Sequence, residues 1–164
     1  MRHGLAMYGL IALIGCDPGD PISAHPCATD EMGVEVAPPD GDYGDLEAGG
    51  AFWVGIPPQG GAPYTPFRVR ISGPDAMFDG VDVEVRVTEG DALVAENVVP
   101  KGLTCANVGE NAGRWVGSEV HLRYYGLELA ELDGRDVEVE VTIVGGETGE
   151  LVATERGRVT LVVD

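Results

Sequence analysis

Hydrophobic and polar residues alternate along several segments of this chain, which is the pattern of a β-strand with one buried face. The clearest case is residues 81–87, where valines at the odd positions alternate with Asp82, Glu84 and Arg86. Residues 137–143 repeat the pattern, with valine and isoleucine against glutamate and threonine. Both segments are therefore predicted to be strands that cover a core with one face only.

Shorter segments of the same kind recur between clusters of glycine, proline and aspartate. These further strands are predicted at residues 34–36, 51–56, 66–72, 93–99, 120–125, 151–153 and 159–163. The stretch around Cys105 and Trp115 has no clear period, and residues 38–50 are predicted to be a loop. The nearest approach to a helical pattern, residues 127–132, is too short to predict a helix.

Many short strands with almost no helix predict an all-β fold, specifically an antiparallel β-sandwich of seven to nine strands. An inter-sheet disulfide and a tryptophan, either Trp53 or Trp115, would suit an immunoglobulin-like or fibronectin-like form of this architecture. The Cys–Trp–Cys spacing of true immunoglobulin domains is absent. We therefore expect the sandwich architecture but do not expect the chain to be a true immunoglobulin domain.

The first sixteen residues follow a different pattern. Arg2 precedes an apolar run over residues 5–14, which is shorter than the roughly 20 residues that span a bilayer as a helix. A cation, a short apolar run and a small residue are the layout of a secretory signal peptide. The run ends in Leu13-Ile14-Gly15-Cys16, which resembles the lipobox of bacterial lipoproteins. The resemblance implies cleavage before Cys16, a diacylglyceryl group on its sulfur, and a lipid anchor on the outer side of a bacterial membrane.

Three segments follow from this interpretation: a lipoprotein signal peptide at 1–15, a lipidated N-terminus and tether at 16–30, and a β-sandwich domain at 31–164. The expected location is the cell envelope, with the inner or outer membrane left open. Two alternatives stay open for the N-terminus. It is either an ordinary signal peptide cut further on, near Ile22-Ser23-Ala24, or an apolar first strand of the fold.

The formal net charge of −18 limits the classes of partner. Nucleic acids and anionic lipid headgroups are bound through clustered cations, so neither is expected to bind this chain. The membrane is expected to hold it through the lipid alone, and a protein or a glycan of unknown identity remains the expected partner. Most of the acidic residues are expected on solvated outer faces of strands.

Three cysteines are present, and Cys16 is assigned to the lipid. Cys27 and Cys105 remain as an even pair in an oxidising compartment, so a disulfide between them is predicted. It would join the N-terminal segment to a loop in the middle of the domain. The alternative is two unpaired thiols.

An acid-rich loop is the best candidate for binding a metal ion. Asp40, Asp42, Asp45 and Glu47 lie close together among glycines, and calcium prefers six to eight oxygen ligands. The pattern departs from an EF-hand, because Tyr43 and Gly44 interrupt it and no helix flanks it. The alternative is a solvated turn in which aspartates bond to nearby backbone N–H groups. No other cofactor is expected.

Two groups of residues form a possible contact patch. Phe52 and Trp53 precede a proline-rich loop that carries Gln59, and aromatic rings beside such a loop suit a peptide or a sugar. The loop is equally explained as a strand connection. His121, Arg123 and Tyr125 are predicted to share one strand face as a small basic and aromatic stripe. Pairing with glutamates on a neighbouring strand is the alternative.

Motifs for catalysis are absent from the sequence: it contains no G-x-S-x-G elbow, no H-E-x-x-H zinc site and no C-x-x-C pair. The chain is therefore not expected to be an enzyme. The predicted function is a lipid-anchored envelope protein with a binding, adhesion or structural role. A calcium- or carbohydrate-binding domain is the first alternative, and an envelope hydrolase is the second.

Overall fold

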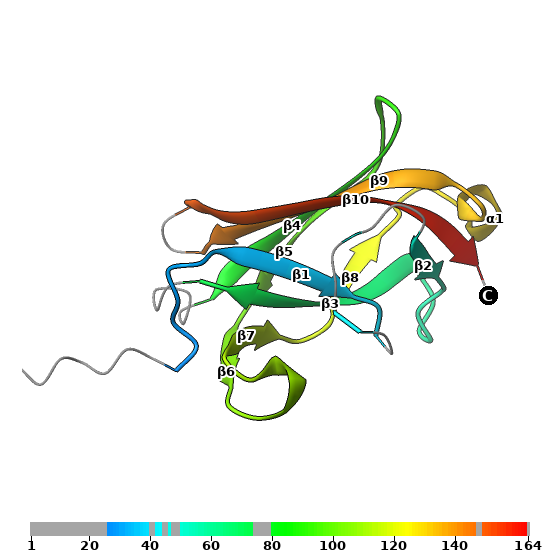
Figure 1. The fold of residues 1–164 in the computed structure, drawn as a ribbon. Coiled ribbons are helices and arrows are strands. Elements are labelled where there is room, and N and C mark those ends of the chain that lie inside the picture. Colours follow the sequence, from blue (N-terminus) through cyan, green and yellow to red (C-terminus); the bar gives the residue numbers. More distant parts are fainter. Residues whose placement is uncertain are drawn as a thin grey trace, which may run out of the picture.

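The computed structural model describes residues 26–39, 42–43, 46, 50–73, 80–146 and 149–163. Within these residues the chain forms two five-stranded β-sheets that pack face to face (Figure 1). The predicted all-β sandwich is confirmed. The predicted boundary at residue 31 and the signal peptide at 1–15 are not tested, because residues 1–25 lie outside the described residues.

The first sheet has the order β1-β3-β7-β6, with β8 also paired to β3. Its strands are β1 (Gly33–Ala37), β3 (Tyr64–Ser72), β6 (Leu103–Ala106), β7 (Arg114–Gly117) and β8 (Val120–Arg123). Strands β7 and β8 lie one after the other along the same side of β3. Strand β8 pairs with the first half of β3 and β7 with its second half.

The second sheet has the order β2-β10-β9-β4-β5. Its strands are β2 (Gly50–Val54), β4 (Val81–Glu89), β5 (Ala92–Lys101), β9 (Asp136–Gly145) and β10 (Leu151–Val163). The chain passes from this sheet to the first at Gly102, the single residue between β5 and β6. Strand β5 is therefore an edge strand of the second sheet, and it lies next to β8 of the first sheet.

The core is built by the alternation that the sequence displays. The four valines of β4 are buried, as are three valines and Ile143 of β9, and the residues between them face outward. The first sheet contributes Phe67, Val69 and Ile71 from one row of β3, and Trp115 from β7. Burying these side chains stabilises the sandwich by about 1.5–3 kcal/mol each before the cost in chain entropy.

Helical structure is brief in the described part of the chain. Helix α1 (Leu129–Leu132) buries Leu132, and the side chains of Glu128 and Glu131 cap its first turn reciprocally. A 3₁₀ turn, η2 (Gly109–Asn111), lies between β6 and β7. Neither these nor any other described helix reaches the length and apolar character that a membrane span requires.

The strand assignment differs from the prediction in two respects. The irregular stretch around Cys105 and Trp115 contains two strands, β6 and β7. The separate strands expected at 151–153 and 159–163 are one continuous strand, β10. The structure therefore has ten strands among its described residues, one more than the predicted maximum.

One strand pair departs from the predicted antiparallel arrangement. Strand β2 runs parallel to β10, with Gly50 opposite Val159 and Val54 opposite Val163. The reason is the route of the chain. Strand β2 follows β1, which lies in the first sheet, and so it joins the second sheet by crossing over and not through a hairpin.

The crossing between β1 and β2 is held at Leu46. Its side chain is buried in the core, and its backbone N–H donates a hydrogen bond to the Glu155 carboxylate on β10. A Cβ atom on Gly157 would lie 1.5 Å from the Leu46 carbonyl oxygen, so only glycine fits at position 157. The loop thus takes the place of a side chain on the inner face of β10.

The predicted disulfide between Cys27 and Cys105 is confirmed, with a Cα–Cα distance of 5.6 Å. Cys105 lies in strand β6, however, and not in a loop. Its backbone partner across the first sheet is Trp115, the buried tryptophan. Immediately after Cys27, Ala28 forms a bridge with Gly73, just beyond the end of β3. The disulfide therefore fastens the start of the described domain to the β6–β7 end of the sandwich.

Candidate functional site

Three aromatic rings lie in contact at the start of β3. The ring centroids of Trp53 and Tyr64 are 6.0 Å apart, and those of Tyr64 and His121 are 5.0 Å apart. Both pairs meet edge to face, the arrangement that aromatic quadrupoles favour. We call Trp53, Tyr64 and His121 the aromatic shelf. It joins the end of β2 to β8 across the first residue of β3.

The position of Trp53 depends on a glycine. Gly55 forms a backbone bridge with Tyr64, and the Trp53 indole lies directly over Gly55. A Cβ atom at position 55 would come within 2.1 Å of the indole. Because residue 55 has no side chain, the ring can lie against this backbone and reach Tyr64. Trp53 remains 38% exposed, so a ligand has access to it.

A shallow pocket of about 320 Å³ lies beside the shelf, between the unpaired sides of β5 and β8. We call it the β5–β8 pocket. It is lined by Asn97, Val98, Val99, Lys101, Glu119, His121, Arg123 and Tyr125. His121 belongs to both the shelf and the pocket, so the two form one continuous surface. Tyr125, which is 70% exposed, forms the outer wall.

Side chains from β5 cross this gap to bind the backbone on the other side. The Asn97 side-chain amide donates to the carbonyl oxygen of His121 at 3.3 Å. The Lys101 ammonium donates to the carbonyl oxygen of Glu119 at 2.6 Å and to the Ser118 hydroxyl at 3.1 Å. These bonds fix the width of the pocket and occupy the exposed carbonyls of the β8 side.

The pocket contains more positive than negative charge. Lys101 and Arg123 are cationic, and the only carboxylate among the lining residues is that of Glu119. Glu119 contacts the His121 ring at 2.7 Å between Oε1 and Nε2. Among the described residues, Arg123 has neither an ion pair nor a hydrogen bond from its side chain. Its half-buried guanidinium is therefore available to an incoming anion.

Further along the first sheet, two arginines surround one tyrosine. The guanidinium carbons of Arg68 and Arg70 lie 5.0 and 4.6 Å from the centre of the Tyr43 ring. Arg70 also donates two hydrogen bonds to the Glu35 carboxylate, at 2.6 and 2.8 Å. These bonds lower the pKa of Glu35 and raise the pKa of Arg70, although burial opposes both shifts. This cluster is already satisfied internally, so its role is to hold Tyr43 and β1 against β3.

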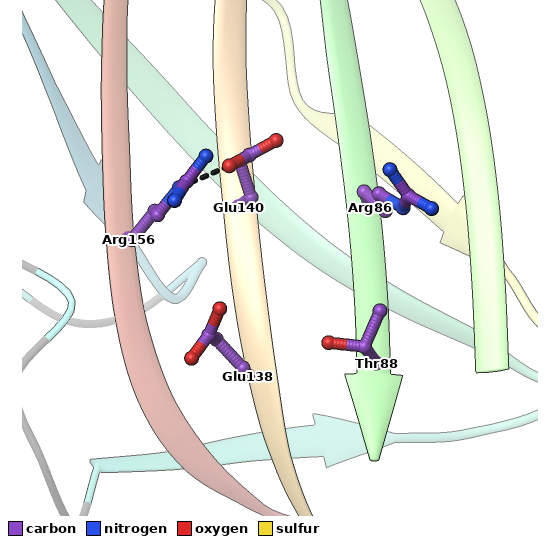
Figure 2. A pocket seen from close by; sticks show the side chains of 5 residues that line it. All are labelled: Arg86, Thr88, Glu138, Glu140 and Arg156. Atoms are coloured by element: carbon purple, nitrogen blue, oxygen red, sulfur yellow. Dashed lines mark ion pairs between the residues drawn. The ribbon is translucent and has the colours of Figure 1, made fainter. Parts of the chain in front are cut away.

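The outer face of the second sheet is organised differently. Glu96, Arg86, Glu140 and Arg156 lie directly opposite one another on four successive strands, so negative and positive charges alternate across the sheet. Figure 2 shows the middle of this face, where Arg156 forms an ion pair with Glu140 and the side chains surround a hollow of about 190 Å³. Opposite charges in directly facing positions stabilise a sheet. This hollow is therefore explained by cross-strand pairing alone.

Only some residues of the predicted contact patch lie together in the structure. His121, Arg123 and Tyr125 do lie together, and Trp53 joins them through Tyr64. The prediction that Phe52 belongs to the contact patch is wrong, because Phe52 is 6% exposed and stacks on Phe67 inside the core. Phe52 and Trp53 are neighbours on one strand, so only one of them faces solvent. Gln59 is exposed in the loop between β2 and β3.

The stripe on β8 also had an alternative interpretation, pairing with glutamates on a neighbouring strand. His121 does have a glutamate partner, but Glu119 comes from the same segment of chain, two residues before it. Arg123 lies opposite Tyr64 in the register of β3 and β8. The cross-strand alternative is therefore wrong for these two residues.

The calcium prediction falls mostly outside the described residues. Asp40, Asp45 and Glu47 are not described, while Asp42 is exposed. Within the described residues, no group of three or more histidine, cysteine, aspartate or glutamate side chains could hold a metal ion. The neighbouring Tyr43 and Leu46 both point to packing partners, on β3 and β10. Cys16, the predicted lipidation site, also lies outside the described residues.

Sequence reasoning missed Tyr64, Asn97 and Lys101. Tyr64 precedes the predicted start of its strand by two residues. Asn97 and Lys101 are inward-facing polar residues on a strand at the side of a sheet. Asn97 could have been noticed in the sequence, because it is polar at a position where the alternation of its strand predicts an apolar residue.

Comparison of the sequence with models of known protein families and with curated proteins found no match.

Proposed function

We propose that this protein is a non-catalytic binding module of the cell envelope, and that the aromatic shelf and the β5–β8 pocket form its contact surface. The observation that carries the proposal is that Arg123, which has no ion pair with any described residue, lies beside Tyr64, His121 and Tyr125. Aromatic and arginine side chains supply most of the binding energy at protein contact surfaces. On a chain with a net charge of −18, a local excess of cations marks one surface for an anionic partner.

Rigidity supports the same proposal. The shelf and the pocket are built on β2, β3, β5 and β8, and the cross-links from Asn97 and Lys101 hold β5 against β8. A surface that is ordered before binding loses less side-chain entropy when a partner docks. The exposed parts of these rings can therefore contribute apolar area to a contact at a low cost in entropy.

We further propose that the sandwich is immunoglobulin-like. The order β1-β3-β7-β6 corresponds to strands A, B, E and D of that fold, and β10-β9-β4-β5 corresponds to G, F, C and C′. The disulfide is a difference, because it joins the segment before β1 to β6 instead of linking the two sheets through strands B and F. Experimental determination of the strand order would test this assignment.

The location rests on the lipobox resemblance of Leu13-Ile14-Gly15-Cys16. Ten residues lie between Cys16 and Cys27, so the extended chain that joins them spans at most about 40 Å. Cys27 lies near the end of β3, whereas Tyr64 is the first residue of that nine-residue strand, about 26 Å away. An anchor at Cys16 would therefore attach to the end of the domain that lies opposite the aromatic shelf.

The contact surface is tested by site-specific photo-crosslinking in intact cells. A photoreactive residue replaces Tyr125 in one variant and Glu138, on the outer face of the second sheet, in another. We expect the first to form a discrete cross-linked product and the second to form none. Equal products from both positions, or none from position 125, would contradict the proposed surface.

The anchor is tested separately by metabolic labelling with a radioactive fatty acid. Cys16→Ala should abolish the label and move the protein out of the membrane fraction, because several acyl chains are needed for stable anchoring. Persistent labelling of this variant would refute the lipidation site. The binding surface would remain untouched by that result.

A further inference from the structure

We propose that the β5–β8 pocket binds the carboxylate group of an acidic sugar chain, with the neighbouring sugar rings lying along the aromatic shelf. This inference rests on the proposed function, since it names the ligand class of the same surface. It requires a cation free to bind a carboxylate, a pocket of suitable size, and flat apolar groups beside it. The described residues provide all three.

The cation is Arg123. Four other arginines of the described chain are already engaged by acids: Arg70 and Arg114 approach Glu35, Arg135 approaches Glu89, and Arg156 approaches Glu140. A planar guanidinium with no internal partner can bind a carboxylate through two parallel hydrogen bonds. Arg123 is half-buried, so water competes less for it than for a fully exposed arginine.

Other charges in the pocket favour an anion. The Lys101 ammonium is fixed by two oxygen acceptors, and its positive charge stays uncompensated by any ion pair within the described residues. The Glu119 carboxylate opposes an anion, but it is directed at the His121 ring. The side chains that line the pocket thus carry a net positive charge in an otherwise acidic domain.

The geometry favours a sugar over an extended peptide. A peptide that adds to the side of a sheet needs free backbone groups along the strand. Here the carbonyl oxygens of Glu119 and His121 are already occupied by Lys101 and Asn97. The pocket of about 320 Å³ is at the small end of ligand sites, which suits one sugar ring with its carboxylate.

The aromatic shelf supplies the rest of the site. From His121 in the pocket, the ring contacts lead to Tyr64 and then to the exposed Trp53. Rings placed in succession beside a carboxylate site suit a linear chain of sugars, whose apolar C–H faces pack on aromatic side chains. Gln59 is exposed in the loop that follows β2, and its amide group can both donate and accept hydrogen bonds.

The repulsion between an acidic polymer and an acidic domain does not prevent this contact. At physiological ionic strength the Debye length is about 8 Å, so most of the −18 net charge is screened at the distance of the pocket. The ligand therefore responds mainly to Lys101, Arg123 and Glu119. Binding should need the local cations and should weaken as salt is added.

The test is calorimetric titration of the full-length chain in detergent micelles. The ligands are oligosaccharides of galacturonic, glucuronic, mannuronic or N-acetylneuraminic acid, each compared with its methyl ester. We expect at least one acid to bind and its ester to bind much more weakly. Arg123→Gln should lower the affinity roughly 10- to 100-fold, the effect of losing hydrogen bonds to a charged group. Trp53→Phe should remove the ligand-induced change in tryptophan fluorescence.

The matched control is Arg158→Gln, since Arg158 is an exposed arginine on the second sheet and forms no ion pair within the described part of the chain. It should bind as the wild type does. No binding by any acidic oligosaccharide, or equal loss in both variants, would overturn the inference. Equal binding of an oligoglutamate peptide through Arg123 would overturn the sugar assignment and leave the proposed surface intact. Cross-links at position 125 without binding of any acidic oligosaccharide would likewise overturn the sugar assignment and leave the proposed surface intact.

Discussion

At the scale of single residues, the ion pair between Glu35 and Arg70 links β1 to β3. The two hydrogen bonds from Arg70 hold the pKa of Glu35 below its usual range. A carboxyl whose pKa is lowered by folding stabilises the folded state at neutral pH. That stabilisation is lost as the pH falls through the lowered pKa.

Replacement of Glu35 should reveal this contribution. We expect Glu35→Gln to reduce the free energy of unfolding by about 1 kcal/mol at pH 7, because the pair is partly exposed. At an acidic pH below the lowered pKa of Glu35, the wild type and the variant should have nearly equal stability. Denaturant melts of both proteins at the two pH values make the comparison. A difference that is as large in acid as at pH 7 would show that packing, and not charge, is lost.

Tyr124 should make the stability of the folded state depend on pH in the opposite direction. Burial raises the pKa of its hydroxyl to about 12, and the hydroxyl lies 3.0 Å from that of Thr65. In the unfolded chain the same group ionises near pH 10. Its contribution is therefore fully present below pH 10 and is lost as the pH rises from about 10 to about 12.

The matching variant is Tyr124→Phe. It should lower stability at pH 7 by about 1 kcal/mol, since the buried Thr65 hydroxyl loses its partner. The alkaline loss of stability between pH 10 and 12 should become smaller than in the wild type. Thermal melts across this range would show it, and an unchanged alkaline profile would assign the loss to other groups.

The same scale shows how far the sequence predicts the site. Alternation correctly placed His121 and Arg123 on the opposite face from Leu122, because a strand has a period of two. It left open which of Phe52 and Trp53 faces the core, because both are large and apolar. Only the pairing of β2 with β10 decides that question, and this pairing joins residues more than 100 positions apart.

At the scale of elements, β10 explains why the prediction split one strand into two. The central residues Glu155, Arg156, Gly157 and Arg158 contain no apolar side chain, so no buried row could be recognised. The inner row here is covered by Leu46, which packs over Gly157 and bonds to Glu155. A contact with a distant loop replaces the local hydrophobic signal.

A substitution at position 157 tests this contact. Gly157→Ala places a methyl group on the backbone of Leu46, so we expect a loss of about 3 kcal/mol or more, typical of severe overpacking. Gly33→Ala is the control, because its added methyl group would meet no atom within 4 Å. Urea unfolding of both variants gives the measurement. Similar stability for the two would mean that the crossing loop can move away without cost.

Strands β6 and β7 were missed for a related reason. Each has four residues, too few for an alternating pattern to emerge. Their inner row is formed by Leu103, Cys105 and Trp115, so a disulfide and one large ring fill the space that several aliphatic residues would otherwise fill. The cysteine count predicted the cross-link, whereas the strands follow from pairing with β3.

At the scale of the whole molecule, the disulfide connects residues that are 78 positions apart. In the chain-entropy model, a loop of this length stabilises the folded state by about 4.5 kcal/mol. We expect the Cys27→Ser, Cys105→Ser double variant to unfold at clearly lower urea concentration than the wild type. The reduced wild type should behave in the same way. If reduction leaves the midpoint unchanged, the sandwich is held without the cross-link.

The same bond also determines how the domain would respond to mechanical force. A pull on the chain before Cys27 meets a covalent branch at once, because the disulfide passes part of the load to β6. The 78-residue span within the loop contains β1 to β5, and it cannot be drawn out while the bond is intact. The peeling of the five-residue β1 from β3 is thereby prevented. In a tethered domain of this design, tension at the N-terminus would leave β1 to β5 inside the closed loop, and reduction of the disulfide would release them.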